Sequence, residues 1–388
     1  MKWLNRSKAR DFKSILTGLV FGGLLVWTTA SLAAEDTWTY KADMPTARGF
    51  VSGCVSEGRI YVIGGFPTHY SVTSAVEMYD PTTNAWTRMA NMPSGRCGHA
   101  ARTFDGKIYV FGGTSPDPYS TAKKNVYVYD PQTDTWTQKA DMPYANALCG
   151  IAVIDDTIYL VGGSLSASSA TVSTLMAYDP VKESWARKAD MPTSRGWLSA
   201  CVVDGKIYAI GGAPQNYQAG CYQNVEVYDP STDTWTRKSD MPTARAAVGT
   251  CVVNGIIYAT GGFSPGGVFA ANEMYDPVTD TWIAKSPMQQ KRLMSFVGSV
   301  ADKVYVVGGS YPDSQGQPVI LSTVEEYDTG FVGPTPDFND DGIVDTKDLL
   351  LLIESWGQDD PLCDIAPPPV GDGVVDALDL EILMSYWG

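Results

Sequence analysis

Six tandem repeats predict an all-β protein, a closed ring of six four-stranded sheets. Two residue series support this fold class. A Gly-Gly pair ends six strand-like runs, from Gly64-Gly65 to Gly308-Gly309, at spacings of 48, 50, 49, 50 and 47 residues. Six Trp residues, from Trp38 to Trp282, follow the same five spacings. Repetition with a period of about fifty residues is typical of proteins assembled from copies of one supersecondary unit.

Each repeat divides into four short strands. The apolar run "AAVGTCVV" (246–253) is joined by the turn "NGI" to the strand "IIYATGG" (256–262). Asn-Gly and Asp-Gly turns between apolar runs are the strongest short signal for a β-hairpin. After a variable stretch comes a strand ending in "YD", and a turn with Pro leads to the Trp strand, such as "DTWTRKS" (233–239). Four antiparallel strands repeated in this way predict the blades of a β-propeller.

The two ends of the repeat region predict how the ring closes. Trp38 precedes the first Gly-Gly pair, whereas the last repeat stops at "TVEEYD", ending at Asp328, with no Trp after it. We therefore expect the N-terminal strand "TWTYKA" (37–42) to complete the sixth blade, with Trp38 pairing near Tyr327. Such a closure removes two exposed sheet edges.

Composition argues against a nucleic-acid-binding protein. The net charge is −15, with acidic residues spread along the chain, whereas nucleic-acid binding needs a basic surface. The Gly-Gly pairs do not predict a phosphate-binding loop, because no Gly-x-Gly-x-x-Gly pattern precedes a helix N-terminus. We interpret these glycines as positions of positive φ and close strand approach.

The repeat resembles the kelch family. The similarity rests on Gly-Gly after an "IY" strand, on "YDP", and on a Trp seven residues after that Tyr, from about Thr37 to Asp328. It implies a propeller. Some kelch enzymes are copper radical oxidases that use two His and Tyr ligands. His69, His99 and Tyr70 could supply these types, but an adjacent His-Tyr pair on a short loop does not predict a metal site.

Strand direction predicts which face of the propeller binds ligands. The connection before the first strand of each blade and the one after the second strand share a face, and the latter varies from 12 to 17 residues. Variable loops on a rigid frame commonly carry binding sites. The expected ligand face holds Phe66, His69, Tyr70, Tyr119, Trp197, Tyr217, Tyr222, Phe263 and Tyr311. Aromatic side chains with Asn and Gln amides nearby suit the binding of sugar rings or extended peptides. The alternative is that most of these aromatic rings pack the loops onto the blades.

Two further residue columns are predicted to be structural. An Arg lies thirteen residues before the "IY" Tyr in five repeats, and Asn146 replaces it in the third; the five are Arg48, Arg96, Arg195, Arg245 and Arg292. A ring of Arg could bind an anion, but a side chain needed in every blade is expected instead to form inter-blade hydrogen bonds that satisfy neighbouring carbonyls. Cys54, Cys201 and Cys251 share one strand position, which predicts buried thiols. With seven Cys in all, no disulfide is predicted.

Residues 1–34 predict a secretory signal peptide. A basic start precedes the apolar run from Ile15 to Trp27, and small residues follow up to Ala33 and Ala34, the expected cleavage positions. The run is shorter than the ~20 residues of a membrane span, so no permanent span is expected; an uncleaved signal anchor is the alternative. We expect a secreted or cell-surface protein whose propeller covers 35–328.

After a Gly/Pro linker (329–336), residues 337–388 predict a calcium-binding segment. In "DFNDDGIVDTKD" the oxygen ligands would come from Asp337, Asn339, Asp341, Asp345 and Asp348 at loop positions 1, 3, 5, 9 and 12, with the carbonyl of Ile343 at 7. This is the spacing of an EF-hand loop. A second copy places Asp372, Val374, Asp376 and Asp379 at positions 5, 7, 9 and 12, and Asp364 would serve at position 1 only if "APPPVG" bulges outward. One calcium ion is expected, and a second is allowed.

Two such loop-plus-helix units resemble a dockerin, which implies a cohesin-like partner on a scaffold or cell surface. Together the regions favour a secreted, calcium-dependent module that binds glycan or protein ligands through its propeller. The alternative is a carbohydrate-active enzyme, whether a glycan hydrolase, a sugar mutarotase or an oxidase, with its site on the same loops. The sequence displays no catalytic constellation, so binding is preferred to catalysis. A third reading is a structural surface-layer protein.

Overall fold

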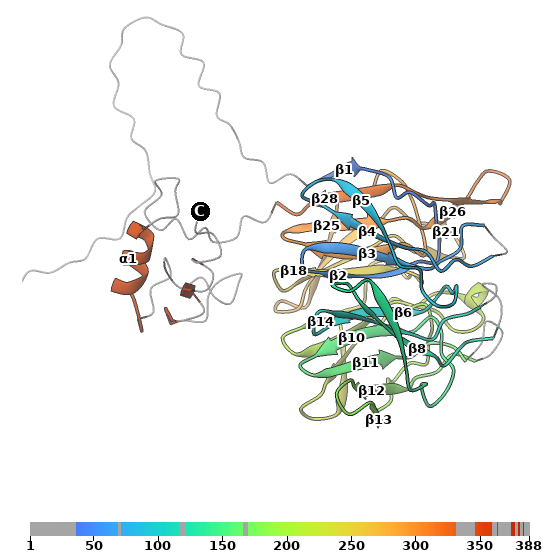
Figure 1. Ribbon diagram of the computed structural model, residues 1–388, viewed down its shortest axis with the longest axis horizontal. Helices are drawn as coiled ribbons and strands as arrows, with labels where there is room; N and C mark the ends of the chain where they lie inside the picture. Colours follow the sequence, from blue (N-terminus) through green and yellow to red (C-terminus); the bar gives the residue numbers. More distant parts are fainter. Residues whose placement is uncertain are drawn as a thin grey trace, which may run out of the picture. The chain divides into compact units, whose positions relative to one another are not determined.

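The computed structural model describes residues 36–68, 71–115, 121–165, 170–330, 346–358, 363, 374–376, 379–380 and 383. Within this part of the chain, nearly all regular structure is antiparallel β-sheet in six four-stranded blades (Figure 1). The first three blades contain β2 (Ser52–Ser56), β3 (Arg59–Ile63), β4 (Val76–Asp80) and β5 (Ala85–Met89); β6 (Ala100–Phe104), β7 (Lys107–Phe111), β8 (Val126–Asp130) and β9 (Thr135–Lys139); and β10 (Gly150–Ile154), β11 (Thr157–Val161), β12 (Leu175–Asp179) and β13 (Ser184–Lys188).

The other three blades follow the same order. They contain β14 (Ser199–Val203), β15 (Lys206–Ile210), β16 (Val225–Asp229) and β17 (Thr234–Lys238); β18 (Gly249–Val253), β19 (Ile256–Thr260), β22 (Asn272–Asp276) and β23 (Thr281–Lys285); and β24 (Phe296–Val300), β25 (Lys303–Val307), β28 (Val324–Asp328) and β1 (Thr37–Lys41). Two short hairpins decorate the loops, β20 (Phe263–Ser264) with β21 (Gly267–Val268), and β26 (Ser310–Pro312) with β27 (Pro318–Ile320). A 3-10 turn spans Tyr217–Ala219.

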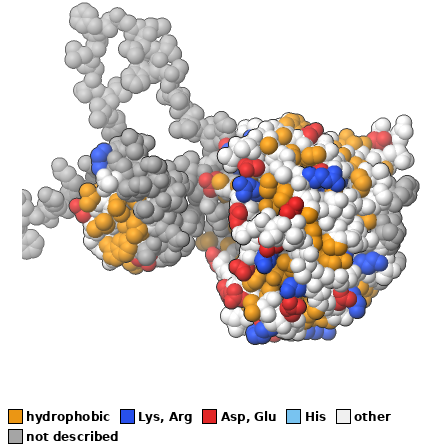
Figure 2. Space-filling model, viewed as in Figure 1, with side chains coloured by type: hydrophobic (Ala, Val, Ile, Leu, Met, Phe, Trp, Pro, Cys, Tyr) orange, Lys and Arg blue, Asp and Glu red, His pale blue; other side chains and the backbone are white. Residues whose placement is uncertain are grey.

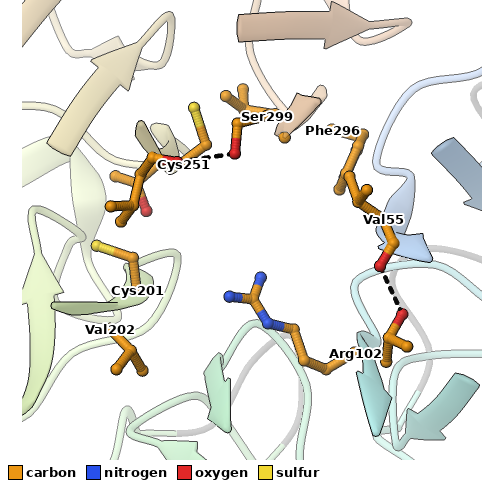
Figure 3. Close-up of a pocket in the computed structure, with 12 residues that line it drawn as sticks. Val55, Arg102, Cys201, Val202, Cys251, Phe296 and Ser299 are labelled. Carbon is orange, nitrogen blue, oxygen red and sulfur yellow. Dashed lines mark hydrogen bonds between the residues drawn. The ribbon is translucent and has the colours of Figure 1, made fainter. Parts of the chain in front are cut away.

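The blades form a closed ring. The first strand of each blade contacts the first strand of the next, and β24 in turn contacts β2. Six hydrophobic clusters fill the ring, and each lies between two neighbouring blades. One blade alone would leave both of its faces exposed, so burial of apolar surface depends on the complete ring. The first strands surround an axial channel, part of which is shown in Figure 3.

The predicted closure is confirmed. β1 pairs antiparallel with β28, beside which it is drawn in Figure 1, and the register of the pair places Trp38 opposite Tyr327. Their ring centroids lie 5.0 Å apart. The sixth blade therefore combines one strand from the start of the repeat region with three from its end, which confirms the six-bladed fold.

The turns also match the prediction. Asp204 and Gly205, between the first two strands of the fourth blade, both have positive φ, at 48° and 66°, as a type I′ hairpin requires. The Gly-Gly pairs have positive φ as well, and a Cβ on Gly64 would lie 2.4 Å from the carbonyl oxygen of Arg96 in the next blade. No side chain fits there, which explains the repeated glycine.

All seven cysteines are free thiols in the structure. Cys54, Cys201 and Cys251 are 1%, 2% and 6% exposed, so the prediction that this column is buried is confirmed. Burial raises the pKa of Cys54 and of Cys201 to about 12. These thiols therefore stay protonated at neutral pH and act as small apolar residues.

The described part of the C-terminal segment contains one helix, α1 (Thr346–Glu354). Leu352 packs with Cys363, Val375 and Leu383 in a small buried cluster. Hydrophobic side chains gather on the surface of this segment (Figure 2). Leu350 and Ile353 of α1 are 58% and 54% exposed. Among the residues that the structure describes, no helix is long and apolar enough to cross a bilayer.

Candidate functional site

Six equivalent residues form a ring where the chain enters the first strand of each blade. All six have left-handed backbone conformations, with φ between 50° and 62°: Phe50, Gly98, Leu148, Trp197, Ala247 and Met294. For Phe, Leu, Trp and Met this conformation costs about 1–2 kcal/mol per residue. Backbone strain of this kind persists only where the surrounding structure enforces it, and it is concentrated at ligand sites.

Hydrogen bonds between neighbouring blades enforce the ring. The N–H of Leu148 donates to the carbonyl of Gly98 at 2.8 Å, and the N–H of Trp197 donates to the carbonyl of Leu148 at 2.9 Å. Ala247 continues the series by donating to Trp197 at 2.8 Å. The left-handed conformation thus turns each N–H toward the preceding blade. It also fixes the side chains of these residues around the mouth of the axial channel.

Side chains of this ring line a cavity of about 470 Å³ on the predicted ligand face. We call it the loop-face cup. Residues from the connections around all six blades contribute: Phe50, Thr114, Ala147, Leu148, Trp197, Gln215, Tyr217, Phe263, Leu293 and Met294. The volume falls within the range of small-molecule and anchor-residue sites. The lining is apolar and aromatic apart from Thr114 and Gln215, so the cup suits an apolar group held by a few polar contacts.

Three aromatic residues selected from the sequence meet at one side of the cup. Trp197 lies edge-to-face with Tyr217, with centroids 6.0 Å apart, and Tyr217 lies edge-to-face with Phe263 at 5.6 Å. Tyr217 is 39% exposed and occupies the 3-10 turn in the fourth blade. These contacts hold the rings in place before any ligand arrives, which lowers the entropic cost of binding.

The other sequence-selected aromatics lie elsewhere. Phe66 is 6% exposed and packs edge-on against Phe50, with centroids 6.0 Å apart. Tyr311 lies in the β26–β27 hairpin with the Lys291 ammonium 5.8 Å from its ring centroid. Tyr222 is partly buried, and its N–H donates to Gly212. His69, Tyr70 and Tyr119 lie outside the described residues.

Sequence reasoning missed the other seven cup residues, namely Phe50, Thr114, Ala147, Leu148, Gln215, Leu293 and Met294. A signal for three of them exists in the repeats. The position two residues after the Arg column holds Phe, Gly, Leu, Trp, Ala and Met in the six blades, although its backbone is left-handed in every blade. A column that varies inside a fixed backbone marks the residues that can specify a ligand.

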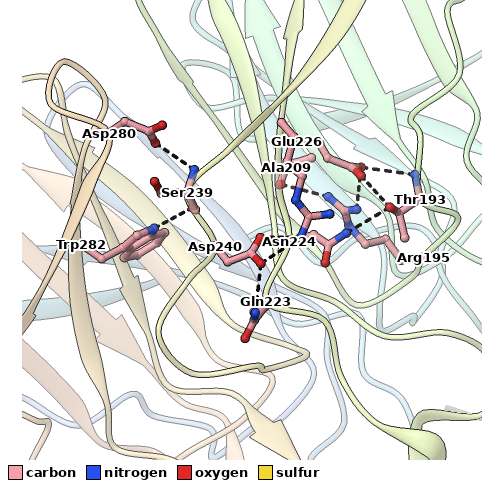
Figure 4. A network of polar contacts seen from close by, with 11 residues as sticks. Thr193, Arg195, Ala209, Gln223, Asn224, Glu226, Ser239, Asp240, Asp280 and Trp282 are labelled. Carbon is pink, nitrogen blue, oxygen red and sulfur yellow. Dashed lines mark hydrogen bonds and ion pairs between the residues drawn. The ribbon is translucent and has the colours of Figure 1, made fainter.

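The Arg column is structural, as predicted, and its partner is a carboxylate. Arg195 is fully buried; its guanidinium donates to Glu226 Oε2 at 2.6 Å and to the carbonyl of Ala209 at 3.0 Å (Figure 4). Thr193 Oγ1 donates to the other oxygen of Glu226 at 2.5 Å. Burial lowers the pKa of Arg195, and Glu226 partly offsets that effect. Arg48, Arg245 and Arg292 pair in the same way with Glu77, Glu273 and Glu325.

The two exceptions in this column support the pairing. Arg96 lacks a Glu partner and instead lies 4.6 Å from the centroid of the Tyr127 ring, a cation–π contact. In the third blade Asn146 replaces Arg, and the position of the Glu is occupied by Met176. In the third blade cation and anion are lost together, whereas in the second blade the cation stays and the Tyr127 ring and the carbonyl of Gly112 replace the carboxylate, because a buried charge needs some compensating partner.

His99 is the one histidine that the described residues include. It is 5% exposed, and neither ring nitrogen has a hydrogen-bond partner in the described structure. Burial, aided by the charges of Arg96 and Arg48, lowers the pKa of His99 to about 3. The imidazole is therefore neutral throughout the physiological range and contributes no charge to the channel.

Most of the expected calcium ligands lie outside the described residues, namely Asp337, Asn339, Asp341, Ile343, Asp345, Asp364 and Asp372. Thr346, the first residue of α1, is position 10 of the expected first loop, so Asp348 falls in the first turn of the helix. In the second copy, Asp379 is buried, and its Oδ2 accepts a 2.7 Å hydrogen bond from the N–H of Asp376. This contact has the geometry of a capping box. Among the residues that the structure describes, no group of three His, Cys, Asp or Glu could hold a metal.

Comparisons with known proteins agree with this architecture. A family model for the KLHDC2/KLHL20/DRC7 Kelch-repeats domain matches residues 18–212 and 148–329. A solved structure titled "Structure of YjhT" aligns with a TM-score of 0.63 at 15% identity, covering 73% of this chain and 95% of that one. A search of curated proteins gave no significant match. In all, 1016 chains of known structure match, so the fold does not by itself specify a function. The periodic Gly-Gly and Trp residues, the closed ring of six blades and the family match together show that the chain belongs to the kelch-repeat family.

Proposed function

We propose that this protein is a secreted binding module whose loop-face cup takes a protein or glycan ligand. Kelch propellers are commonly scaffolds for protein interactions, and this chain contains a kelch propeller. In the proposal the propeller supplies recognition. The C-terminal segment, loaded with calcium, acts as a dockerin-like tether to a cohesin-like partner on a scaffold or cell surface.

The loop-face cup is the observation that carries the proposal. It combines a volume of about 470 Å³ with rigid walls formed by strained residues such as Trp197 and Met294. Large apolar residues in costly conformations add nothing to closure of the ring, since Gly98 and Ala247 hold the same position in other blades. Selection for a ligand surface gives a physical reason for their size.

Of the two ligand classes, the lining favours a protein. Leu148, Leu293 and Met294 offer apolar contact without directional polar groups, and Met adapts its shape to varied apolar partners. Sugar rings need hydrogen bonds to their many hydroxyls, and among the described lining residues Thr114, Gln215, the Tyr217 hydroxyl and the Trp197 indole N–H are the few polar side-chain groups. We therefore infer that the cup accepts one bulky apolar or aromatic side chain of a partner protein.

A peptide display library and a glycan array, both screened with the whole protein, test this function. The informative variant is Trp197→Ala, because it shortens one wall of the cup. The matched control is Val278→Ala, since Val278 is 89% exposed in the turn between β22 and β23, on the opposite face. Peptides with an aromatic or large aliphatic anchor should be enriched by the protein and by the control, and lost with Trp197→Ala. If the protein bound glycans and no peptides, the sugar-binding alternative would be favoured. If Trp197→Ala bound ligands as well as the wild type does, the cup would be excluded as the binding site.

For the tether, two features support the proposal. The ligands expected from the sequence are all oxygen atoms, which suits calcium. The exposed side chains of Leu350 and Ile353 lie three residues apart in α1, and the exposed Trp356 follows two residues after the helix ends, so apolar side chains face solvent along this segment. An exposed apolar surface of this kind fits a docking partner.

A further inference from the structure

The axial channel contains a second cavity, of about 260 Å³, that is separate from the loop-face cup. Its walls come from the first strands of five blades, β2, β6, β14, β18 and β24 (Figure 3). A smaller cavity of about 170 Å³ shares Arg102 with it and includes residues nearer the start of the same strands. The channel is thus hollow along much of its length.

Arg102 is the unusual residue in this channel. It is the third residue of β6, and the third residues of the other five first strands are Cys54, Ala152, Cys201, Cys251 and Gly298. Five blades therefore place a small side chain, or none, where the second blade places a guanidinium. Figure 3 shows that the Arg102 side chain extends from its strand into the open centre of the cavity.

Arg102 also differs from the buried Arg column in its lack of a hydrogen-bond or ion-pair partner among the described residues, since even Arg96, which has no Glu partner, donates to the carbonyl of Gly112 at 2.8 Å. Arg48, Arg195, Arg245 and Arg292 each contact a Glu. Arg102 makes no ion pair or hydrogen bond with any residue that the structure describes. Among the described residues that line the two channel cavities, none is Asp or Glu. A partly buried cation without a partner costs stability, so a role in binding explains its retention.

The walls around Arg102 restrict what the cavity can hold. Val55, Val202, Val252 and Phe296 present apolar surface. Two wall hydroxyls are already used as donors, since Thr103 Oγ1 donates to the Val55 carbonyl and Ser299 Oγ to the Val252 carbonyl, each at 2.8 Å. The guanidinium is therefore the principal free donor group, with five N–H bonds in a planar fork that matches a carboxylate.

From this combination we infer that the axial cavity binds a small carboxylate with a short apolar body, held by Arg102. The guanidinium pairs with the carboxylate through two parallel hydrogen bonds, while the valine and Phe296 walls cover the apolar part. An inorganic oxyanion would gain nothing from those walls and would lose its hydration. A cavity of about 260 Å³ lies at the small end of ligand sites, which favours a short carboxylate over a larger one.

This site does not depend on the proposed function, because it uses different residues from the loop-face cup. Isothermal titration of the whole protein with butyrate, at constant ionic strength, tests it directly. Butyramide, which keeps the shape and lacks the charge, and sulfate, which is anionic and lacks the apolar tail, are the comparison ligands. Wild-type protein should bind butyrate, bind sulfate more weakly, and fail to bind butyramide.

Variants separate a binding role from a structural one. Arg102→Ala copies Ala152 of the third blade, so the variant should fold, and its thermal midpoint should match or exceed that of the wild type. It should lose butyrate affinity at least tenfold, whereas Arg102→Lys should lose less. Arg237→Ala, which removes an exposed Arg paired with Asp240, should leave affinity unchanged. Absence of butyrate binding in the wild type, equal binding by Arg102→Ala, or binding of sulfate alone would each overturn the inference.

Discussion

Tyr327 donates a 2.7 Å hydrogen bond from its hydroxyl to Asp36 Oδ1, although 291 positions separate the two residues in the chain. The same oxygen of Asp36 accepts the N–H of Ser286 from the fifth blade at 2.9 Å. One carboxylate therefore joins the two ends of the sixth blade to its neighbour. Equivalent bonds recur within single blades, for example from Tyr228 to Asp233 at 2.7 Å. This arrangement explains why "YDP" and "DTW" recur together.

We predict that Asp36→Ala weakens closure of the ring. The variant removes an acceptor for two donors, and because Asp36 is partly exposed the expected loss in the free energy of unfolding is only about 1 kcal/mol. Urea denaturation measures it. Asp36→Asn is the matched control, since Asn84 accepts the equivalent bond from Tyr79 in the first blade at 2.7 Å; it should stay close to the wild type. Equal stability of all three proteins would show that closure does not depend on this contact.

A pH dependence follows from the same carboxylates. Hydrogen bonds from the N–H of Ala189 and the hydroxyl of Tyr228 lower the pKa of Asp233 in the folded protein. Because the pKa of this carboxyl is lower in the folded protein than in the unfolded chain, its ionised form stabilises the fold at every pH above the unfolded-state pKa of about 3.9. That stabilisation is lost as the pH falls through the pKa of the folded state. Stability should therefore change little from pH 7 to about pH 5 and fall below about pH 4. Urea denaturation at several pH values measures this. In Asp233→Asn the free energy of unfolding should fall less steeply below pH 4 than in the wild type. An equally steep fall would contradict the attribution of this pH dependence to Asp233.

The buried Arg–Glu pairs give a sharper prediction. Glu226→Ala leaves the guanidinium of Arg195 buried without its counterion, and we expect a loss of about 3–5 kcal/mol in the free energy of unfolding. The double variant Arg195→Asn with Glu226→Met copies Asn146 and Met176 of the third blade. It should recover most of that loss in a double-mutant cycle. If the double variant were less stable than Glu226→Ala, the third blade would have to tolerate its Asn and Met through contacts that the fourth blade lacks.

How much of this structure the sequence predicts depends on whether a feature repeats. Gly64-Gly65, Trp38 and their equivalents recur at matched spacings, so blade number, turns and closure follow from counting. The Glu226 partner of Arg195 was missed because it lies 31 residues away, and only the blade brings the two together. Arg102 was missed for the opposite reason, since a residue that occurs once in its column leaves no periodic signal. Sites built from such exceptions become visible once the strands are placed around the channel.

Strain at the loop-face cup predicts a separation of stability from binding. Trp197→Gly copies Gly98 of the second blade, so it relieves a left-handed conformation worth about 1–2 kcal/mol while losing the ring contact with Tyr217. The free energy of unfolding should therefore stay within about 1 kcal/mol of the wild type. Ligand selection in the peptide screen should nevertheless disappear. A large loss of stability would instead mean that Trp197 is needed for folding, and retained selection would remove it from the site.

Calcium binding supplies the last prediction, because the C-terminal segment is small and its described residues form one small buried cluster, around Leu352. A domain of this size commonly needs a metal to fold. Titration of the whole protein with calcium should show at least one site, and Asp341→Ala should remove it, since Asp341 would supply position 5 of the first loop. Asp190→Ala, in an exposed ion pair with Arg187, is the control and should bind as the wild type does.

Asp379→Asn distinguishes the second loop: it should lower the calcium stoichiometry if Asp379 is a ligand, and leave it unchanged if that carboxylate serves only to cap the helix. Calcium binding that survives Asp341→Ala would contradict the assignment of the first loop.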